Sequence, residues 1–330
     1  MFGHNYNGQL GTRDTQNKLV PTNVMKDIKY VSCGGLHTGV ITTDNKLFTF
    51  GDNRSGQLET GDTQNRSVPT YVINDIKHVS CGGDHTGVIT TDNKLFMFGY
   101  NIEGQLGTEH KYRVVPTNVM NNIKYVSCGA YHTGVITTDN KLFMFGLNDC
   151  GQLGTGDKNK RSVPTHVMNN IKYISCGEFH TGVITIDSKL FMFGNNDYGK
   201  LGMEDIQDRL IPTHIMDNIK YISCGLAHTG VITKDNKLFM FGLNTFGQLG
   251  TGDEQNRLIP THIMNNIKYV SCGGDHTGVI TTYNKLFMLG YNNDGQLGTD
   301  DKRYRPTPTE IMSNVRFVSC GTVHTGVIRN

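Results

Sequence analysis

Short apolar or β-branched segments recur along the whole chain, and Gly, Asn, Asp or Pro separates each segment from the next. This pattern is typical of short strands joined by turns. In its second copy we expect four strands, named A to D, at residues 79–81, 86–90, 94–98 and after Pro116. Asp92 and Asn93 supply turn-forming residues for the B–C hairpin. Strand C is a continuous apolar run, which predicts a sheet covered on both faces.

One unit of 47 or 48 residues accounts for the entire pattern, and this period is typical of propeller blades. Seven turns of the form GQL, or GKL at residues 199–201, keep the same step. So do seven cysteines: Cys33, Cys81, Cys128, Cys176, Cys224, Cys272 and Cys320. Seven units of four antiparallel strands predict an all-β protein with the architecture of a seven-bladed β-propeller.

The two ends of the chain supply complementary parts of one unit. Met1 aligns with Met97 and Asn330 with Thr91, so only the five positions equivalent to 92–96 are unfilled. We therefore expect residues 1–25 and 317–330 to share one blade, in which the N- and C-terminal strands pair and close a single domain of residues 1–330. The alternative is an open solenoid, which should have atypical capping repeats, and the sequence shows none.

Composition fits this architecture and narrows the possible partners. The 330 residues include 40 glycines, which suit tight turns, and 31 Lys and Arg against 29 Asp and Glu, a formal net charge of +2. So small a charge gives no broad basic field, so nucleic-acid binding is not expected. The sequence has neither the opening of a signal peptide nor a stretch long enough to span a bilayer. We expect an intracellular monomer, cytoplasmic or nuclear, that does not contact membranes.

Four recurring elements, SCGxxHTGVIT, KLFMFG, NxxGQLG and VPT, resemble the regulator of chromosome condensation 1 (RCC1) repeat family over essentially the whole chain. The resemblance implies a closed seven-bladed propeller. Members of the family include exchange factors for the small GTPase Ran, chromatin binders, ubiquitin-ligase domains, a plant ultraviolet receptor and a secreted inhibitor of β-lactamase. Fold alone therefore does not decide function.

This sequence differs from several of these family members, and the differences restrict the functions it can have. The Ran exchange factor carries an inserted β-wedge and a basic N-terminal tail, whereas the repeats here vary by one residue in length and use the whole chain. The ultraviolet receptor absorbs through clustered tryptophans, and this protein has no Trp. We expect no catalytic activity and no cofactor, and a protein as the partner, with a small GTPase among the possibilities.

A column of seven histidines raises the question of a metal or catalytic site. They are His37, His85, His132, His180, His228, His276 and His324. No acid or second ligand stands at a fixed short offset from each of them, so we expect no metal and a structural role in satisfying backbone groups inside each blade. The seven repeated cysteines are expected to be buried and unpaired. Cys150 lies outside the repeat, in a turn, and is a candidate for an exposed thiol.

An acid precedes a base by four residues in every C–D connection, which predicts seven exposed ion pairs. They are Asp14–Lys18, Asp62–Arg66, Glu109–Arg113, Asp157–Arg161, Asp205–Arg209, Asp253–Arg257 and Asp301–Arg305. A more basic arc is the alternative site, for contact with phosphate, and comprises Lys111, Arg113, Lys158, Lys160 and Arg161. The glycine-rich turns lack the GK[ST] ending and following helix of a phosphate loop.

Variation among the repeats is confined to two places, the pair between SCG and HTG and the positions that flank Asn before GQL. Both belong to A–B and C–D connections, which emerge on one face of an antiparallel blade. The candidate partner-binding residues there are Tyr6, Leu36, Asp84, Tyr100, Tyr131, Leu147, Glu178, Phe179, Tyr198, Leu226, Phe246, Asp275 and Tyr291. Asp52, Glu103 and Leu243 stand among them.

Aromatic side chains on rigid loops suit a protein interface. The first hypothesis is therefore a non-catalytic protein-interaction module or scaffold that uses this face. The alternatives are an exchange factor for a Ran-like GTPase, which depends on the resemblance alone, and a chromatin-associated protein that uses the basic arc. Drift in unconstrained turns also explains variation, but it predicts mostly small polar substitutions.

Overall fold

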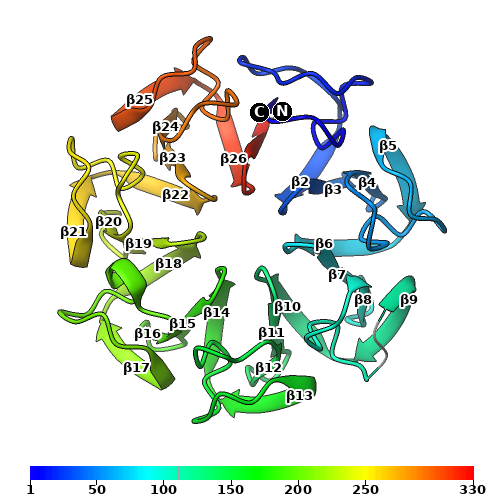
Figure 1. Ribbon diagram of the computed structural model, residues 1–330, viewed down its shortest axis with the longest axis horizontal. Coiled ribbons are helices and arrows are strands. Elements are labelled where there is room, and N and C mark those ends of the chain that lie inside the picture. Colours follow the sequence, from blue (N-terminus) through cyan, green and yellow to red (C-terminus); the bar gives the residue numbers. More distant parts are fainter. Residues whose placement is uncertain (110–111) are drawn as a thin grey trace.

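Seven antiparallel sheets surround a central axis in the computed structural model (Figure 1). The structure describes residues 1–109 and 112–330, with the side chains of 112–117 left out. The innermost strands, A, are β2 (Ile28–Cys33), β6 (Ile76–Cys81), β10 (Ile123–Cys128), β14 (Ile171–Cys176), β18 (Ile219–Cys224), β22 (Ile267–Cys272) and β26 (Val315–Cys320). The B strands are β3 (His37–Thr42), β7 (His85–Thr90), β11 (His132–Thr137), β15 (His180–Thr185), β19 (His228–Thr233), β23 (His276–Thr281) and β27 (His324–Arg329).

The C and D strands complete each blade toward the outside. The C strands are β1 (Phe2–Gly3), β4 (Leu47–Gly51), β8 (Leu95–Tyr100), β12 (Leu142–Gly146), β16 (Leu190–Gly194), β20 (Leu238–Gly242) and β24 (Leu286–Gly290). The D strands are β5 (Arg66–Ile73), β9 (Tyr112–Met120), β13 (Arg161–Met168), β17 (Arg209–Met216), β21 (Arg257–Met264) and β25 (Arg305–Met312). A 3₁₀ turn, η1 (Asp197–Gly199), lies in one C–D connection. The predicted all-β, seven-bladed propeller is confirmed.

The position of strand D corrects the sequence-based prediction. We expected strand D to follow Pro116, but β9 begins at Tyr112, and Pro164 likewise lies inside β13. Strand D is the outer edge of its blade, where a residue without an N–H group need not interrupt a ladder. The register between β12 and β13 also shifts between Met144 and Gly146, so Pro164 lies where the pairing of the two strands is irregular.

The ends of the chain close the ring as predicted. β1 pairs with β27 in the register Phe2↔Thr325, and Cys33 N–H donates to Ser319 Oγ at 2.9 Å, as Cys81 does to Ser32. In Figure 1 the two termini lie together between β26 and β2. The contact is the same in kind at the closure as between any other two blades.

The closing blade nevertheless departs from the four strands that we expected. It contains three, β1, β27 and β26, and the fourth position is reduced to one bridge between Gly3 and Lys18. The physical reason is the length of β1. A two-residue strand offers the neighbouring residues 18–22 too few backbone partners to form a ladder.

Apolar residues fill the space between neighbouring blades. In one cluster Ile41 and Leu47 of the first blade pack with Ile76, Val79 and Cys81 of the second. Equivalent clusters recur around the ring. The seven repeated cysteines are buried and unpaired, as predicted. The core of this protein is thus a set of inter-blade layers, each built from the same repeat positions.

The seven histidines join neighbouring blades, which corrects the expectation that they satisfy backbone groups within a blade. Each imidazole Nε2 lies 2.8–2.9 Å from the hydroxyl of a Thr in the next blade. That hydroxyl donates its one hydrogen to the carbonyl of the GQL or GKL residue, as Thr133 does to Gln105 at 2.8 Å. The hydroxyl must therefore accept from an Nε2–H group. We call these seven contacts the inter-blade framework.

Burial keeps the framework histidines neutral. It lowers the pKa of six of them to about 3, and that of His180 well below its usual value. Their Nδ1 atoms have no hydrogen-bond partner among the described residues. An imidazole that is fully buried, neutral and already bound at Nε2 is a structural group.

Candidate binding face

The A–B and C–D connections of each blade meet on one face of the ring. The first residue of a C–D connection donates its backbone N–H to the A–B turn of the same blade, from Asp52 to Leu36 at 2.9 Å and from Leu147 to Tyr131 at 3.0 Å. The A–B turns surround the mouth of the axial channel, a cavity of about 120 Å³ lined mainly by the repeated Cys and Gly residues. We call this surface the variable face.

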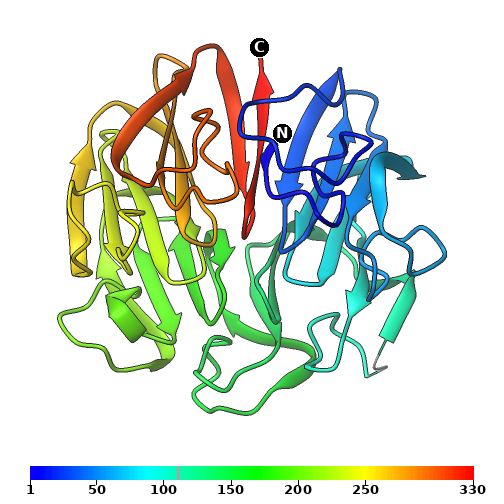
Figure 2. The ribbon, with the colours of Figure 1, turned by 45° about the horizontal axis from the view of Figure 1, so that its top comes forward.

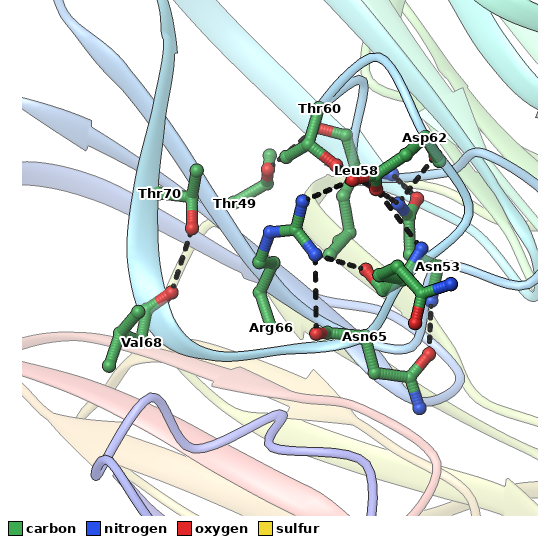
Figure 3. Close-up of polar contacts among 10 residues, drawn as sticks. Thr49, Asn53, Leu58, Thr60, Asp62, Asn65, Arg66, Val68 and Thr70 are labelled. Carbon is green, nitrogen blue, oxygen red and sulfur yellow. Dashed lines mark hydrogen bonds and ion pairs between the residues drawn. The ribbon is translucent and has the colours of Figure 1, made fainter.

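A buried asparagine organises each C–D connection, as Figure 3 shows for Asn53. Its Oδ1 accepts the Leu58 N–H at 2.9 Å, and its amide donates to the Thr60 hydroxyl at 3.0 Å and to the Asp62 carbonyl at 2.8 Å. The Asp62 carboxylate then pairs with Arg66 at 2.6 Å. One side chain near the start of the 14-residue connection thus bonds three residues farther along it, so the turn residues between them are held on a rigid base.

The predicted acid–base pairs are confirmed for six connections. N–O distances are 2.7 Å for Asp14–Lys18 and 2.6 Å for the pairs that involve Asp62, Asp157, Asp205, Asp253 and Asp301. The seventh pair, Glu109–Arg113, lies outside the residues whose side chains are described. Hydrogen bonding to the basic partner is the largest cause of the lowered pKa of each acid.

All thirteen predicted partner-binding residues reach the surface. Three are exposed, namely Tyr6 at 69%, Tyr198 at 48% and Tyr131 at 37%. The other ten are half-buried: Leu36, Asp84, Tyr100, Leu147, Glu178, Phe179, Leu226, Phe246, Asp275 and Tyr291. Seven belong to A–B turns around the channel mouth: Leu36, Asp84, Tyr131, Glu178, Phe179, Leu226 and Asp275. Five of the remaining six belong to C–D connections farther out, and Tyr100 is the last residue of the C strand β8.

Five aromatic residues of the variable face form two separate groups. Tyr131 and Phe179, from adjacent A–B turns, are stacked with ring centroids 5.8 Å apart. On the next part of the ring Phe246 contacts Tyr291 at 4.8 Å, and both contact Tyr304, at 5.1 and 5.3 Å. Stacked and edge-on rings at these distances stabilise one another and hold their orientation.

Tyr304 was missed from the sequence. It stands at a third variable place, the residue before the base of each ion pair, and we had recognised only two such places. The equivalent residues include Asn17, Asn65, Lys160 and Asp208, so the signal was present in the repeat alignment. Where this residue is Asn it bonds the organising asparagine, as Asn65 does to the Asn53 N–H at 3.0 Å. Tyrosine gives up that contact and joins the aromatic group.

Tyr198 adopts an unusual backbone conformation for an aromatic residue. Its φ is 64°, inside η1, in the left-handed region that favours Gly and Asn. A bulky residue there costs about 1–2 kcal/mol. Tyr198 is also 48% exposed, so burial of its ring does not offset the cost. Retained strain of this kind is a pointer to a functional surface.

Half-buried carboxylates lie in three of the A–B turns. Burial is the largest cause that raises the pKa of Asp84, Glu178 and Asp275. Gln57 and Gln248 donate to Asp84 and Asp275, each at 3.3 Å. A neutral amide satisfies an acceptor but does not neutralise a charge, so these acids favour a cationic partner.

Two cations lie among the same acids. Arg54 pairs with the buried Asp52 at 2.8 Å and extends into solvent. Lys200, which replaces the glutamine of the GQL turn, is buried at 3% exposure, and burial is the largest cause that lowers its pKa. The Coulomb interaction with Lys200 opposes the raised pKa of Glu178.

The other two predicted features, the Cys150 thiol and the basic arc, do not have the properties expected of a reactive thiol or of a phosphate-binding site. Cys150 is half-buried rather than exposed, and burial raises its pKa, which disfavours the thiolate. In the basic arc Lys160 pairs with Glu103 at 3.3 Å, Lys158 lies 4.0 Å from Asp208, and Arg161 pairs with Asp157. Lys111 and the side chain of Arg113 lie outside the described residues. Each described cation of the arc thus faces a carboxylate.

Within the described ranges, no three His, Cys, Asp or Glu side chains are grouped to hold a metal ion. In the same part of the chain, no helix is long and apolar enough to cross a membrane.

Family models cover nearly the entire chain. The RCC1-like domain model matches residues 1–218, and the regulator of chromosome condensation (RCC1) repeat model matches residues 219–248, 235–280 and 283–328. No curated protein sequence matches the chain.

Solved structures share the architecture at low identity. Human WBSCR16 superposes with a TM-score of 0.89 at 21% identity over 100% of this chain and 98% of its own. Prp20p from Saccharomyces cerevisiae, described with its binding to Gsp1p and histones, gives 0.89 at 20% over 100% and 91%. Yeast RCC1 (Prp20) bound to Kap60 gives 0.83 at 19% over 100% and 88%. At these identities the likeness establishes the fold.

Proposed function

This chain belongs to the RCC1-like domain family, and from that membership we propose that it is a non-catalytic interaction module that binds a protein partner through the variable face. One observation carries the proposal. The large aromatic and half-buried acidic side chains that distinguish one repeat from another gather on the A–B and C–D connections. The B–C turns on the opposite face repeat nearly the same TTDNK sequence.

The geometry indicates the chemistry of the partner. Tyr131 and Phe179 form a stacked pair beside the channel mouth, and rigid aromatic pairs of this kind are typical centres of protein interfaces. Glu178 flanks the pair, and Asp84 and Asp275 lie on other blades of the same ring. We infer a partner whose apolar contact patch is bordered by Lys or Arg side chains.

Relatives and chemistry support a protein ligand inside the cell. Prp20p, which shares the fold, is described with its binding to Gsp1p and histones. All eight cysteines here are free thiols, which suits a reducing compartment such as the cytoplasm or nucleus. We include that location and a monomeric state in the proposal.

The test is capture of partners from cell extract, identification by mass spectrometry, and affinity measurement with variants. Tyr131→Ala with Phe179→Ala should weaken binding by about 2 kcal/mol or more, roughly thirtyfold. The matched control is Ile186→Ala with Tyr283→Ala, which removes two exposed apolar side chains, at 55% and 71%, from B–C turns on the opposite face. Equal affinities for the two double variants would show that the partner does not bind the variable face.

The alternative function is nucleotide exchange on a Ran-like GTPase, which the family membership suggests. The described sheets contain only the blade strands, with no additional hairpin of the wedge type. Nucleotide-release rates from a panel of small GTPases would decide it. Acceleration that Tyr131→Ala and Phe179→Ala abolish would make the GTPase the partner of the same face, whereas no acceleration would end this alternative.

A further inference from the structure

Lys200 interrupts a column of glutamines on the variable face. It follows η1, the short green coil in Figures 1 and 2, in the C–D connection of the fourth blade, which comprises β14 to β17. The other six repeats have glutamine at this position: Gln9, Gln57, Gln105, Gln152, Gln248 and Gln296. The lysine therefore replaces a neutral amide with a cation at one of seven equivalent places.

Glutamine stabilises the turn that precedes it, and lysine cannot do so. In the six other repeats its Oε1 accepts the backbone N–H of the residue two positions earlier, as from Ser55 to Gln57 at 2.9 Å. An ammonium group is a donor only. The equivalent residue of the fourth blade is Tyr198, with a φ of 64°, whereas no positive φ occurs at its six counterparts, which are all among the described residues. The strained turn at Tyr198 thus accompanies the loss of the glutamine acceptor.

The ammonium group of Lys200 also lacks a partner within the protein. Lys200 is 3% exposed, yet in the described part of the chain its Nζ makes no ion pair and no hydrogen bond. Burial is the largest cause that lowers its pKa, and Coulomb interactions with Asp197 and Glu178 oppose this, although neither carboxylate is within ion-pair distance. Nζ is not among the fully enclosed atoms without partners, so a ligand can reach it. A buried cation without a partner destabilises the free protein.

The equivalent glutamines show which group this position binds. Gln57 donates to Asp84 at 3.3 Å, and Asp275 accepts from the glutamine of the fifth blade at the same distance. Each of these acids lies in the A–B turn of the next blade. The corresponding residue beside Lys200 is Ala227, which is half-buried and has no acceptor in its side chain. The protein thus supplies a carboxylate to two of the glutamines but none to the lysine, which would bind it more strongly.

We propose that Lys200 binds an acidic side chain of the protein partner, in the place that Asp84 and Asp275 occupy beside the equivalent glutamines. This inference rests on the proposed function, because it concerns the same face. The ammonium group interacts electrostatically with Glu178, next to which Phe179 contributes to the stacked aromatic pair. The acid therefore binds close to that pair.

The site gives the variable face an orientation. Seven similar blades offer a partner seven similar ways to bind. A partner with Lys or Arg opposite Asp84 and Asp275, and with an acid opposite Lys200, matches the face in one of them only, because a rotated partner places like charges together. The departure of the fourth blade from the repeat thus contributes to specificity.

The experiment titrates the 330-residue chain, isotope-labelled at lysine, with the end-blocked tripeptide acetyl-Leu-Asp-Leu-amide and follows it by NMR spectroscopy. We expect a saturable shift of the Lys200 ε-carbon signal, which is assigned by its absence from Lys200→Gln. Asparagine in place of the peptide's aspartate keeps the shape but removes the charge, so it should weaken binding by about tenfold or more.

Two variants separate recognition from structure. Lys200→Gln restores the residue of the other repeats, so it should unfold at least about 2 °C higher than the natural chain and bind the peptide about tenfold more weakly. Ala227→Asp supplies the carboxylate from the chain itself, so it should also unfold at a higher temperature and should no longer bind the peptide. The matched control is Lys158→Gln, which removes an exposed cation from the neighbouring C–D connection and should bind as the natural chain does.

Several results would overturn the proposal. These are no saturation up to about 10 mM peptide, equal affinity for the aspartate and asparagine peptides, or a lower unfolding temperature for Lys200→Gln, which would make Lys200 a structural residue. Inorganic phosphate that binds as tightly as the peptide would show a site for free anions instead. The titration needs no partner, so its failure leaves the capture test with Tyr131→Ala and Phe179→Ala unaffected, and the two failures are distinguishable.

Discussion

The inter-blade framework and the variable face are built from adjacent residues. The framework is nearly the same in every blade, whereas the variable face changes from one blade to the next. Framework contacts are almost identical in all seven blades, with His–Thr distances of 2.8–2.9 Å. The A–B turn next to each framework histidine holds Leu36 in one blade, Asp84 in the next and Tyr131 in the third. Stability requires the repetition of one arrangement, and recognition requires departure from it.

The backbone explains how the two regions coexist. Tyr131 serves the fold through its carbonyl, which accepts the Leu147 N–H, and not through its ring. Its neighbour His132 serves the fold through its side chain, which binds Thr181. Variable positions thus support the propeller with their main chain and leave their side chains available for a partner. The fold can exchange these side chains at little cost.

Acid should destabilise the inter-blade framework, because its histidines are buried and neutral. Burial lowers the pKa of the framework histidines to about 3, below the value of 6.5 in an unfolded chain. The unfolded state therefore binds more protons below pH 6.5, and the free energy of unfolding falls by up to about 1.4 kcal/mol per pH unit for each histidine. Seven of them give up to about 10 kcal/mol per pH unit, so we expect cooperative unfolding between about pH 6 and pH 5.

Urea denaturation followed by circular dichroism from pH 8 to pH 5 measures this dependence. The matched control is His166→Gln with His262→Gln, which removes two exposed histidines and should leave the acid limb unchanged. Stability that stays flat down to pH 5 would contradict the assignment of neutral, bonded framework imidazoles.

A pair of substitutions two residues apart sharpens the comparison. Thr133→Val leaves the His85 Nε2–H without an acceptor and the Gln105 carbonyl without its donor, which should cost about 2–5 kcal/mol of unfolding free energy. Tyr131→Ala removes a partly exposed ring and should cost less than about 1 kcal/mol. Chemical denaturation of the two variants measures both. Similar costs at the two positions would erase the distinction between framework and variable face.

Glu59 departs from the repeat at a turn position where the other six repeats have Gly, and a substitution can restore the glycine. Its φ is 58°, where six repeats have Gly with φ between 68° and 79°. Its Oε2 has no hydrogen-bond partner in the described part of the chain, and burial raises its pKa to about 7. Glu59→Gly should stabilise the protein by about 1–2 kcal/mol at pH 8.

The pH dependence of this gain separates its two causes. Because the folded pKa lies above the unfolded value of 4.5, the carboxylate destabilises the fold increasingly as pH rises from 4.5 to 7. Glu59→Gln removes this charge but keeps the backbone cost, so it should recover only the pH-dependent part. If Glu59→Gly is less stable than the natural chain at pH 8, the strained-turn interpretation is wrong.

The repeat made most of the fold readable from the sequence, because seven copies of one pattern average out local ambiguity. The period fixed the blade count, and the offset between Met1 and Asn330 predicted the closure. The contacts between blades were not readable. A histidine and a threonine 48 or 49 residues apart give no local signal of contact, so the framework was mistaken for bonds within a blade.

The sequence predicted on which face the candidate site lies, but not which of its aromatic side chains contact one another. Variation placed Tyr131 and Phe246 on one face, but only coordinates show that they belong to separate aromatic groups. Tyr304 was missed because only two variable places of the repeat were recognised, and its position is a third.

Hydrogen–deuterium exchange of the captured complex tests the central claim most directly. With the partner bound, the account predicts added protection in the A–B turns and C–D connections, strongest around Tyr131, Phe179 and Tyr291, and no change in the B–C turns. Protection confined to the B–C turns, or spread equally over both faces, would contradict a recognition surface formed by the variable turns.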